Sequence, residues 1–223
     1  MEIFPSMRHC RCSWRIGCDF FYHMMQQYLL ATSNKGKIIE MRECFSGLPI
    51  ELLAPDDLPH PPTMPHEEED TFEGNAIEKA RYYYKKTGIP SIADDSGILV
   101  EALKEELGIH TRRWGAGPEA SDGEWIEYFL ERMKHEKNKC AEFVCVLALA
   151  DGEKDIHTFE GRCSGVITEE LEAEYLPGLP ISACFRPEGS SKVFSALSVE
   201  KKNQISHRGK AVKELREFLE SKI

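Results

Sequence analysis

The 223-residue sequence has no apolar run long enough to cross a membrane as a helix. Such a helix needs about 18 uninterrupted apolar residues, whereas the most apolar stretch, residues 143–150, has only the length of a strand. Disordered and collagen-like classes are also excluded, because 41% of the residues are hydrophobic, an ordinary share for a globular chain. We therefore expect a soluble protein with a full core and no membrane partner.

Positive charge is also scarce. Lys and Arg number 28 against 38 Asp and Glu, which gives a formal net charge of −10. This balance repels a phosphate backbone at long range, so nucleic acid is not an expected partner. Any phosphate group must instead be bound at a local basic site. The same acidic balance is common among soluble cytoplasmic enzymes, and we expect a cytoplasmic location.

The eight cysteines include no Cys-x-x-Cys pair and no spacing of the zinc type. Since Cys145 and others lie among apolar residues, we interpret them as reduced thiols rather than a disulfide framework. Three cysteines and two histidines gather within residues 9–23, where a metal knuckle is a weaker alternative. This segment has no clear apolar period, so we predict an extension at 1–24 and a single domain at 25–223. A start codon upstream of Met24 or Met25 explains the segment equally well.

The order of the remaining segments predicts a mixed α/β fold. Residues 28–31 indicate a strand, followed by a polar turn and a helix with apolar residues at helical spacing. Further helices are predicted to begin near residues 71, 121 and 206, the first two at capping-box patterns. Residues 91–93 predict a short strand, 142–149 with 155–159 a hairpin, and 163–167 another strand. Residues 98–103 fit either a strand or a helix.

Two polar segments follow predicted strands and could bind a phosphorylated ligand. Residues 32–37 could offer free backbone N–H groups, a positive helix end and the Lys37 side chain, although the Walker A spacing is absent and polar turns are common. Asp94 and Asp95 follow the strand at 91–93, where carboxylates can hold Mg²⁺, with residues 67–69, three glutamates, completing the ion site. The simpler interpretation is a turn residue beside a solvated acidic loop.

Two further groups are weaker on their own. Asn75 and Lys79 are four residues apart on one helix face and could reach one ligand together. Lys202, His207 and Arg208 gather where the last helix begins, although basic groups are unfavourable at the positive end of a helix. A bound anion would remove that conflict, and an accident of the surface is the alternative.

Taken in order, these segments resemble the inosine triphosphate pyrophosphatase family, which hydrolyses deaminated purine nucleoside triphosphates such as ITP, dITP and XTP to monophosphate and pyrophosphate. The resemblance runs from about residue 28 to the C-terminus and rests on four motifs, residues 31–40, 71–80, 93–97 and 202–209. It implies an elongated α/β fold with a long mixed sheet, flanking helices and two lobes around a central cleft. It also implies dependence on Mg²⁺, a nucleoside triphosphate substrate and a homodimer.

The resemblance assigns roles to individual residues. Asp95 would be catalytic, helping to activate water, and would share a metal ion with Glu67. The substrate-binding residues would be Thr32, Ser33, Asn34, Lys37, Lys79, Ser96, Lys202, His207 and Arg208.

One stretch departs from the family pattern. Where the family carries Phe-Gly-Tyr-Asp-Pro, which packs on and reads the base, residues 179–183 are Leu-Pro-Ile-Ser-Ala. Losing a stacked aromatic costs about 1–3 kcal/mol per base, enough to change base choice without changing the phosphate chemistry. Trp114 could stack instead, although core packing is the simpler interpretation. The alternatives to the family activity are therefore altered base specificity, a nucleotide-binding or sensing protein, and, more weakly, a phosphoryl transferase such as a kinase.

Overall fold

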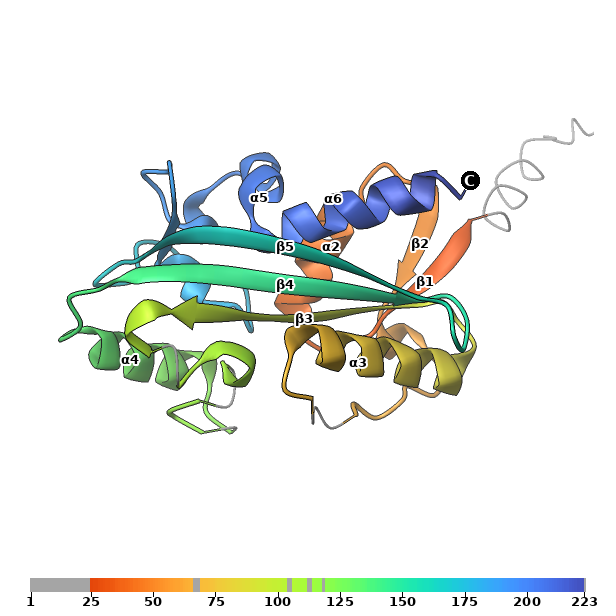
Figure 1. Cartoon of the computed structure of the whole chain (residues 1–223), viewed down its shortest axis with the longest axis horizontal. Helices are drawn as coiled ribbons and strands as arrows, with labels where there is room; N and C mark the ends of the chain where they lie inside the picture. The colour runs from red at the N-terminus through yellow and green to blue at the C-terminus, as the bar shows by residue number, and fades with distance from the viewer. Residues whose placement is uncertain (1–24, 66–68, 104–105, 112–113, 118, 223) are drawn as a thin grey trace, which may run out of the picture.

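The structure is a computed structural model that describes residues 25–65, 69–103, 106–111, 114–117 and 119–222. It has the predicted elongated mixed α/β fold. The long strands extend along the long axis of the molecule, and helices lie on both faces of the sheet (Figure 1). The strands are β1 (Gln26–Leu30), β2 (Ile50–Leu53), β3 (Ser91–Val100), β4 (Cys140–Ala150), β5 (Ile156–Ile167) and β6 (Phe185–Pro187). The helices are α2 (Lys35–Cys44), α3 (Phe72–Thr87), α4 (Asp122–Met133), α5 (Val199–Ile205) and α6 (His207–Glu220). The predicted extension at 1–24 lies outside the described residues.

The six strands form one sheet in the order β2-β1-β3-β4-β5-β6. β1 pairs in parallel with β2 and β3, whereas β3, β4, β5 and β6 pair antiparallel. Two predictions are wrong here, because β3 continues through Asp94 and Asp95 to Val100, and β5 is one strand rather than two. The apolar run of β4 pairs with β3 from Ser91 to Val100, and this pairing overrides the turn-forming residue types in the middle of β3.

The helices begin where the sequence predicts. The Thr71 side chain accepts a hydrogen bond from the Gly74 N–H at 3.0 Å, and Ser121 with Glu124 completes a capping box at the start of α4. Ser206 caps α6 in the same way, and Gly88, in the left-handed conformation, ends α3. The short elements β2, α5 and β6 were not predicted, because four, seven and three residues are too few to show a period.

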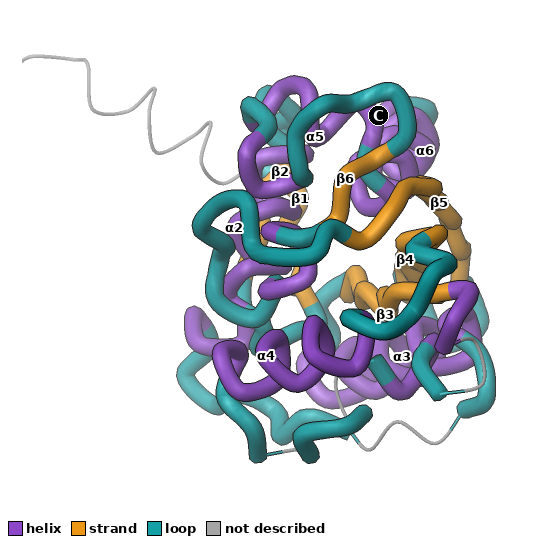
Figure 2. The backbone as a smooth tube through the Cα atoms, turned by 90° about the vertical axis from the view of Figure 1, so that its left-hand side faces the viewer, coloured by secondary structure: helices purple, strands orange, loops and turns teal. Residues whose placement is uncertain are grey.

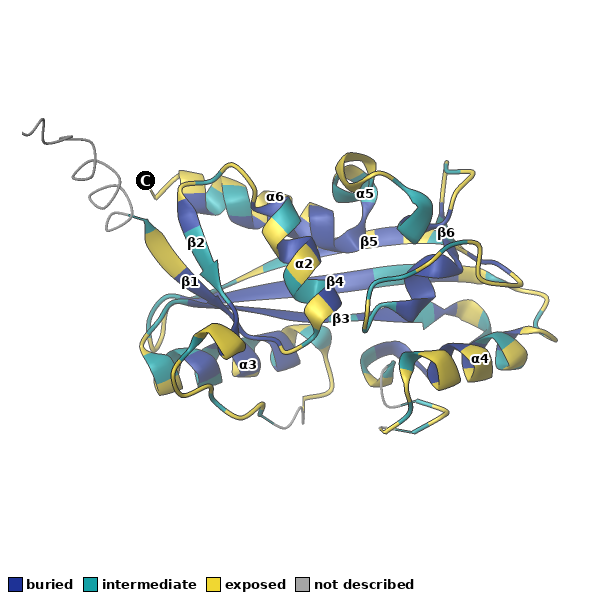
Figure 3. Cartoon of the chain, turned by 180° about the vertical axis from the view of Figure 1, so that it is seen from behind, coloured by how far each residue is buried: buried dark blue, intermediate teal, exposed yellow. Residues whose placement is uncertain are grey.

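Helices cover the two faces of the sheet separately. α3 and α4 lie on one face, and α2, α5 and α6 lie on the other, as the view along the long axis makes clear (Figure 2). Buried positions concentrate on the strands and on the helix surfaces turned toward them (Figure 3). No helix among the described residues combines the length and the apolar character that a membrane span requires.

Gly161 of β5 lets the first turn of α6 lie directly on the sheet. A Cβ atom at this position would lie 2.0 Å from the carbonyl oxygen of His207 and 2.7 Å from the backbone nitrogen of Ala211. Both of those atoms belong to the backbone, so no side chain can move aside to make room. The glycine therefore fixes the position of the helix start that carries two of the predicted substrate-binding residues.

We expect Gly161→Ala to lower the free energy of unfolding by about 1–3 kcal/mol, because α6 must shift to accommodate the added carbon. Gly123→Ala in α4 is the matched control, since its nearest neighbouring atom, the Ser121 Oγ, would lie 3.9 Å from the new Cβ. The control should be as stable as the parent or slightly more stable. Urea unfolding followed by circular dichroism measures both, and equal stability of the two variants would contradict the packing argument.

Candidate active site

A pocket of about 520 Å³ lies between the two ends of the molecule. Its walls come from the β1–α2 turn, the middle of β3, the start of α4, residues 178–182 and the start of α6. The structure brings together every predicted site residue that it describes. Those lining the pocket are Thr32, Ser33, Asn34, Lys37, Lys79, Asp95, Ser96, Lys202, His207 and Arg208. Glu67, the other predicted metal ligand, lies outside the described residues.

The β1–α2 turn is held by hydrogen bonds within the protein. The Asn34 side chain accepts from the Lys37 N–H at 3.0 Å and donates to the Gly178 carbonyl at 3.1 Å, while the Gly36 N–H donates to the Pro177 carbonyl at 3.1 Å. These bonds tie the turn to residues 177–178 on the far side of the pocket. The prediction of a cradle of free N–H groups is therefore wrong for Gly36 and Lys37, whose N–H groups already have acceptors. Of the two lysines in this segment, Lys37 is the one whose side chain lines the pocket.

Asp94 is the centre of a buried ion network. Its carboxylate lies 2.6 Å from the Lys37 Nζ and 2.7 Å from the Arg208 Nε, and it accepts from the Ser96 hydroxyl at 2.8 Å. Burial raises the pKa of Asp94, but Arg208 and Lys37 outweigh burial and hold that pKa well below its ordinary value. Asp94 is thus ionised and fully engaged by protein groups. It does not line the pocket, so the prediction that the adjacent acids act together on a metal does not hold for Asp94.

Glu40 completes the network on the other side of Arg208. Its carboxylate forms ion pairs with both Lys202 and Arg208. Burial lowers the pKa of Arg208, but Asp94 and Glu40 outweigh burial and raise it well above its ordinary value. The basic groups at the start of α6 are therefore balanced by carboxylates of the protein, which removes the conflict with the helix dipole without a bound anion.

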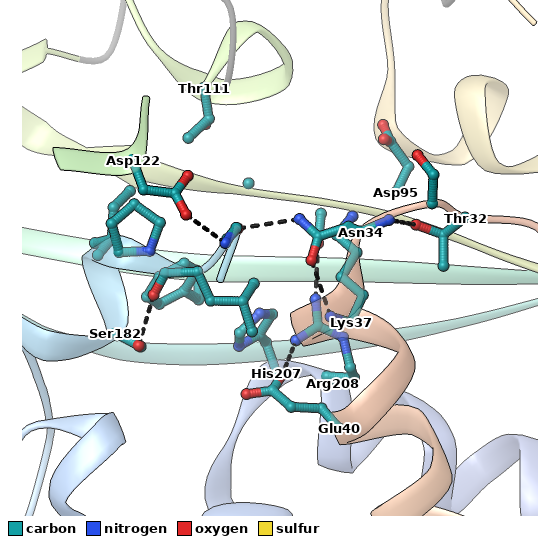
Figure 4. A pocket seen from close by; sticks show the side chains of 18 of the residues that line it. Thr32, Asn34, Lys37, Glu40, Asp95, Thr111, Asp122, Ser182, His207 and Arg208 are labelled. Carbon is teal, nitrogen blue, oxygen red and sulfur yellow. Dashed lines mark hydrogen bonds and ion pairs between the residues drawn. The ribbon is translucent and has the colours of Figure 1, made fainter. Parts of the chain in front are cut away.

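Asp95 faces the opposite side of β3 from Asp94, because successive strand residues point to opposite faces of a sheet. Its carboxylate lies 3.3 Å from the Nζ of Lys79 on α3, and the same ammonium donates to the Asp94 carbonyl at 3.3 Å. Asn75, one turn before Lys79, accepts from the Glu69 N–H at 3.2 Å and does not line the pocket. Figure 4 places Asp95 beside Thr32 at one end of the pocket.

The other end of the pocket has apolar walls. They are formed by Ile109, Trp125, Phe143, Leu179, Ile181 and Phe194. The divergent segment at 179–183 forms a short 3-10 helix, residues 180–183, held by a hydrogen bond of 2.6 Å from the Ser182 hydroxyl to the Leu179 carbonyl. Asp122 accepts from the Gly178 N–H at 2.5 Å and fixes the chain before it. Trp114 packs in T-shaped contacts on Trp125 and Tyr128 and does not line the pocket, as the core-packing interpretation predicts.

His207 lies between the two ends. Its ring stacks on Phe143 with centroids 4.5 Å apart, and its Nδ1 has no hydrogen-bond partner among the described residues. Burial, reinforced by the neighbouring Arg208, lowers the pKa of His207 well below its ordinary value, so the imidazole is neutral at neutral pH. The buried ring is therefore a neutral part of the pocket wall.

Sequence reasoning singled out residues 179–183 but missed Ile109, Trp125, Phe143 and Phe194, the other residues of the apolar end. Trp125 and Phe143 carry no signal of their own in the sequence, because a pocket wall and a core face show the same apolar period. Asp122 follows a capping serine and carries no sign of its contact with Gly178. Among the described residues no three His, Cys, Asp or Glu side chains lie close enough to form a metal site on their own.

Known proteins of similar sequence belong to the family that the four sequence motifs indicate. Residues 28–218 match the sequence model of the Ham1 family. The dITP/XTP pyrophosphatase of Leptospira interrogans is 40% identical over 199 residues, covering 89% of this chain and 100% of that protein. The enzyme of the same name from Thermus thermophilus is 40% identical over 191 residues, 85% of this chain and 89% of that protein.

Solved structures of Ham1 proteins have a similar fold. A HAM1 protein from Coxiella burnetii has a TM-score of 0.74 at 32% identity, covering 88% of this chain and 100% of that one. The Staphylococcus aureus Ham1 protein has a TM-score of 0.73 at 33% identity, covering 89% of this chain and 100% of that one. The chain therefore belongs to the Ham1 family.

Proposed function

We propose that this protein hydrolyses deaminated purine nucleoside triphosphates, namely ITP, dITP and XTP, to the monophosphate and pyrophosphate. The observation that carries the proposal is that residues from four separate motifs line a single pocket, with cations at one end and apolar walls at the other. Its relatives from Leptospira interrogans and Thermus thermophilus are named dITP/XTP pyrophosphatases. The protein is accordingly a hydrolase acting on a triphosphate anhydride bond.

The charges of the pocket support binding of a triphosphate at the end near Asp95. Four cations, Lys37, Lys79, Lys202 and Arg208, are paired with the three carboxylates of Glu40, Asp94 and Asp95, which leaves one net positive charge. A nucleoside triphosphate brings about four negative charges, which such sites balance with Mg²⁺. The cations of the protein alone therefore leave most of the substrate charge unbalanced.

The residues present fit a magnesium ion. Mg²⁺ is usually held by one or two carboxylates together with phosphate oxygens and water, rather than by a cage of protein ligands. Asp95 offers such a carboxylate in the pocket, and the family resemblance adds Glu67 as the second. When bound, Mg²⁺ would neutralise phosphate oxygens and lower the barrier to attack on phosphorus.

The reaction requires a water molecule to attack the α-phosphorus. A P–O bond forms from the water oxygen, the bond from the α-phosphorus to the bridging oxygen breaks, and pyrophosphate leaves with that oxygen. Asp95 would orient the water and accept its proton, as a general base within the pocket. Lys37, Lys79 and Arg208 would stabilise the negative charge that develops on the phosphate oxygens. Thr32, Ser33, Asn34, Ser96 and Lys202 would position the triphosphate, and His207 would contact the substrate as a neutral group.

Other features follow from the family resemblance. Residues 25–223 would form one catalytic domain, preceded by an extension at 1–24, in agreement with a family match that begins at residue 28. The protein would act as a homodimer. A cytoplasmic location is supported by the free thiols of all five cysteines within the described part of the chain.

A second candidate is a nucleotide-binding or sensing protein without turnover. The 3-10 helix at residues 180–183 favours it, because aliphatic side chains there replace the aromatic base platform of the family pattern. Saturable nucleotide binding without release of pyrophosphate would distinguish it from the hydrolase.

We expect the protein to convert ITP, dITP and XTP to monophosphate and pyrophosphate in the presence of Mg²⁺. In H₂¹⁸O the label should enter the monophosphate, because water attacks the α-phosphorus. Mass spectrometry of the products measures its position, with the four standard nucleotides as comparison substrates. Label in pyrophosphate, release of orthophosphate, or no turnover of any nucleotide would contradict the proposed reaction.

Asp95→Asn should lower kcat for ITP by about 100-fold or more, since the amide cannot accept the proton of the water. The matched control is Asp155→Asn, which changes an exposed aspartate beside His157 in the β4–β5 hairpin, outside the pocket. Steady-state pyrophosphate release measures both variants, and thermal unfolding confirms that each is folded. Turnover by folded Asp95→Asn at the parent rate would remove Asp95 from the mechanism.

Removal of divalent metal with EDTA should lower turnover of ITP by about 100-fold or more, because substrate charge is then left unbalanced. Excess Mg²⁺ should restore the original rate, while the same concentration of Na⁺ as chloride salt should not. Undiminished turnover after exhaustive treatment with EDTA would contradict the proposed dependence on Mg²⁺ and leave the hydrolysis itself standing.

A further inference from the structure

Residues 176–182 include most of the segment that departs from the family pattern. Within the part of the chain that the structure describes, three hydrogen bonds link them to segments distant in sequence, and all three meet at Pro177 and Gly178. The Pro177 carbonyl accepts from the Gly36 N–H, and the Gly178 carbonyl accepts from the Asn34 side chain, both at 3.1 Å. The Gly178 N–H donates to the Asp122 carboxylate at 2.5 Å. Two residues therefore carry the hydrogen-bonded support of the segment.

The backbone of Gly178 is held from both sides. Figure 4 shows the side chains of Asp122 and Asn34 directed toward each other, and their hydrogen bonds place Gly178 between them. Gly178 has a φ of +80°, and a Cβ atom there would lie 2.4 Å from the Asn34 Nδ2. Glycine is the residue that fits this gap and this conformation. The position from which Leu179 and the following residues start is therefore closely defined.

Asp122 supports the segment independently of the β1–α2 turn. Asn34 and Gly36 both belong to the junction of β1 and α2, whereas Asp122 opens α4 on the other face of the sheet. A capping box closes the first turn of α4, and Trp125 and Phe129 are buried on its inner face. A hydrogen bond to a carboxylate is about twice as strong as one between neutral groups. Asp122 thus ties the segment to a well-anchored helix.

The supported segment faces the apolar end of the pocket. Leu179, Ile181 and Ser182 line that end together with Phe143 and Phe194. An apolar pocket with a few polar groups suits a heterocyclic base, whose triphosphate would extend toward the cationic end. Leu179 and Ile181 are uncharged and would attract a base through dispersion forces, which weaken sharply when a gap opens. Their contribution to binding therefore depends on where the segment lies.

We propose that Asp122 is a positioning residue for recognition of the nucleotide base, because it holds Gly178 and, through it, the wall formed by residues 179–182. This inference rests on the proposed function. A wall released from Asp122 would occupy its binding position for only part of the time, and the apparent affinity for a base falls in proportion to that fraction. The ion pairs of Asp94 at the cationic end do not involve this wall, so attack on phosphorus would proceed as before once the substrate is bound.

The experiment separates binding of the base from the chemical step. Asp122→Ala removes the acceptor of the Gly178 N–H. We expect KM for ITP to rise by about tenfold, as for the loss of one hydrogen bond, while kcat changes by less than about twofold. Inhibition by inorganic tripolyphosphate, which has no base, should also change by less than about twofold. Glu127→Ala is the matched control, because it removes an exposed carboxylate of α4 outside the pocket and should keep the parental constants.

Asp122→Asn distinguishes positioning from a direct contact with the substrate. The amide oxygen can still accept from the Gly178 N–H, so KM should stay within about threefold of the parental value. Both variants remove the negative charge from the first turn of α4, so an effect of that charge on the helix would be the same in both. A KM raised as much by asparagine as by alanine would overturn the positioning role, as would a fall in kcat with KM unchanged.

A second measurement does not depend on turnover. The dissociation constant of inosine monophosphate, measured by calorimetry, should rise by about tenfold in Asp122→Ala and stay within about threefold in Asp122→Asn. Thermal unfolding checks that each variant is folded. If Asp122→Ala does not fold, Asp122→Ser replaces it, because its hydroxyl is one bond shorter than the carboxylate and serine is favourable near the start of a helix.

The outcomes separate this inference from the proposed function. If the parent hydrolyses ITP and folded Asp122→Ala keeps the parental KM, the role of Asp122 is overturned while the hydrolase stands. If the parent hydrolyses no nucleotide, the proposed function fails, and the dissociation constants of inosine monophosphate alone decide the role of Asp122. A parent protein that does not bind inosine monophosphate overturns the inference as well.

Discussion

The contact between the Asp94 carboxylate and Arg208 joins the parts of the molecule that build the pocket. Asp94 lies in the middle of β3, Arg208 begins α6, and Lys37 on α2 binds the same carboxylate from a third direction. Because a strand alternates its side chains, fixing Asp94 toward α2 and α6 turns Asp95 toward α3 and Lys79. One buried ion cluster therefore sets the orientation of the residue that would activate water.

Burying charge is unfavourable unless every charged group has a partner, so this cluster is weak evidence for stability and stronger evidence for positioning. Glu40 provides the second carboxylate for Arg208 and the partner of Lys202, which leaves both cations held before any substrate arrives. Cations held in this way need little reorganisation when phosphate binds, and preorganised charge is a large source of rate enhancement in enzymes. The network thus prepares the cationic end of the pocket in the free protein.

The cationic end of the pocket could be predicted from the sequence, whereas the apolar end could be predicted only at residues 179–183. The family resemblance singled out Lys37, Lys79 and Arg208, and the structure brings all three to one pocket. Trp125 and Phe143 have the apolar period of ordinary core residues, so no pattern separates a pocket wall from a packed interior. The full length of β3 could not be predicted from local sequence either, because its ten residues pair with β4, a strand about 50 residues further along the chain.

This division between the two ends explains how one segment can diverge while the rest of the site is kept. Charged groups at the cationic end depend on each other, since removing one partner leaves the others buried and unpaired. The aliphatic side chains of Leu179 and Ile181 line the pocket without charge and so form no ion pair with the Asp94 cluster. In the proposed function, electrostatics constrains the binding of the triphosphate, while packing shapes the part of the pocket that would receive the base.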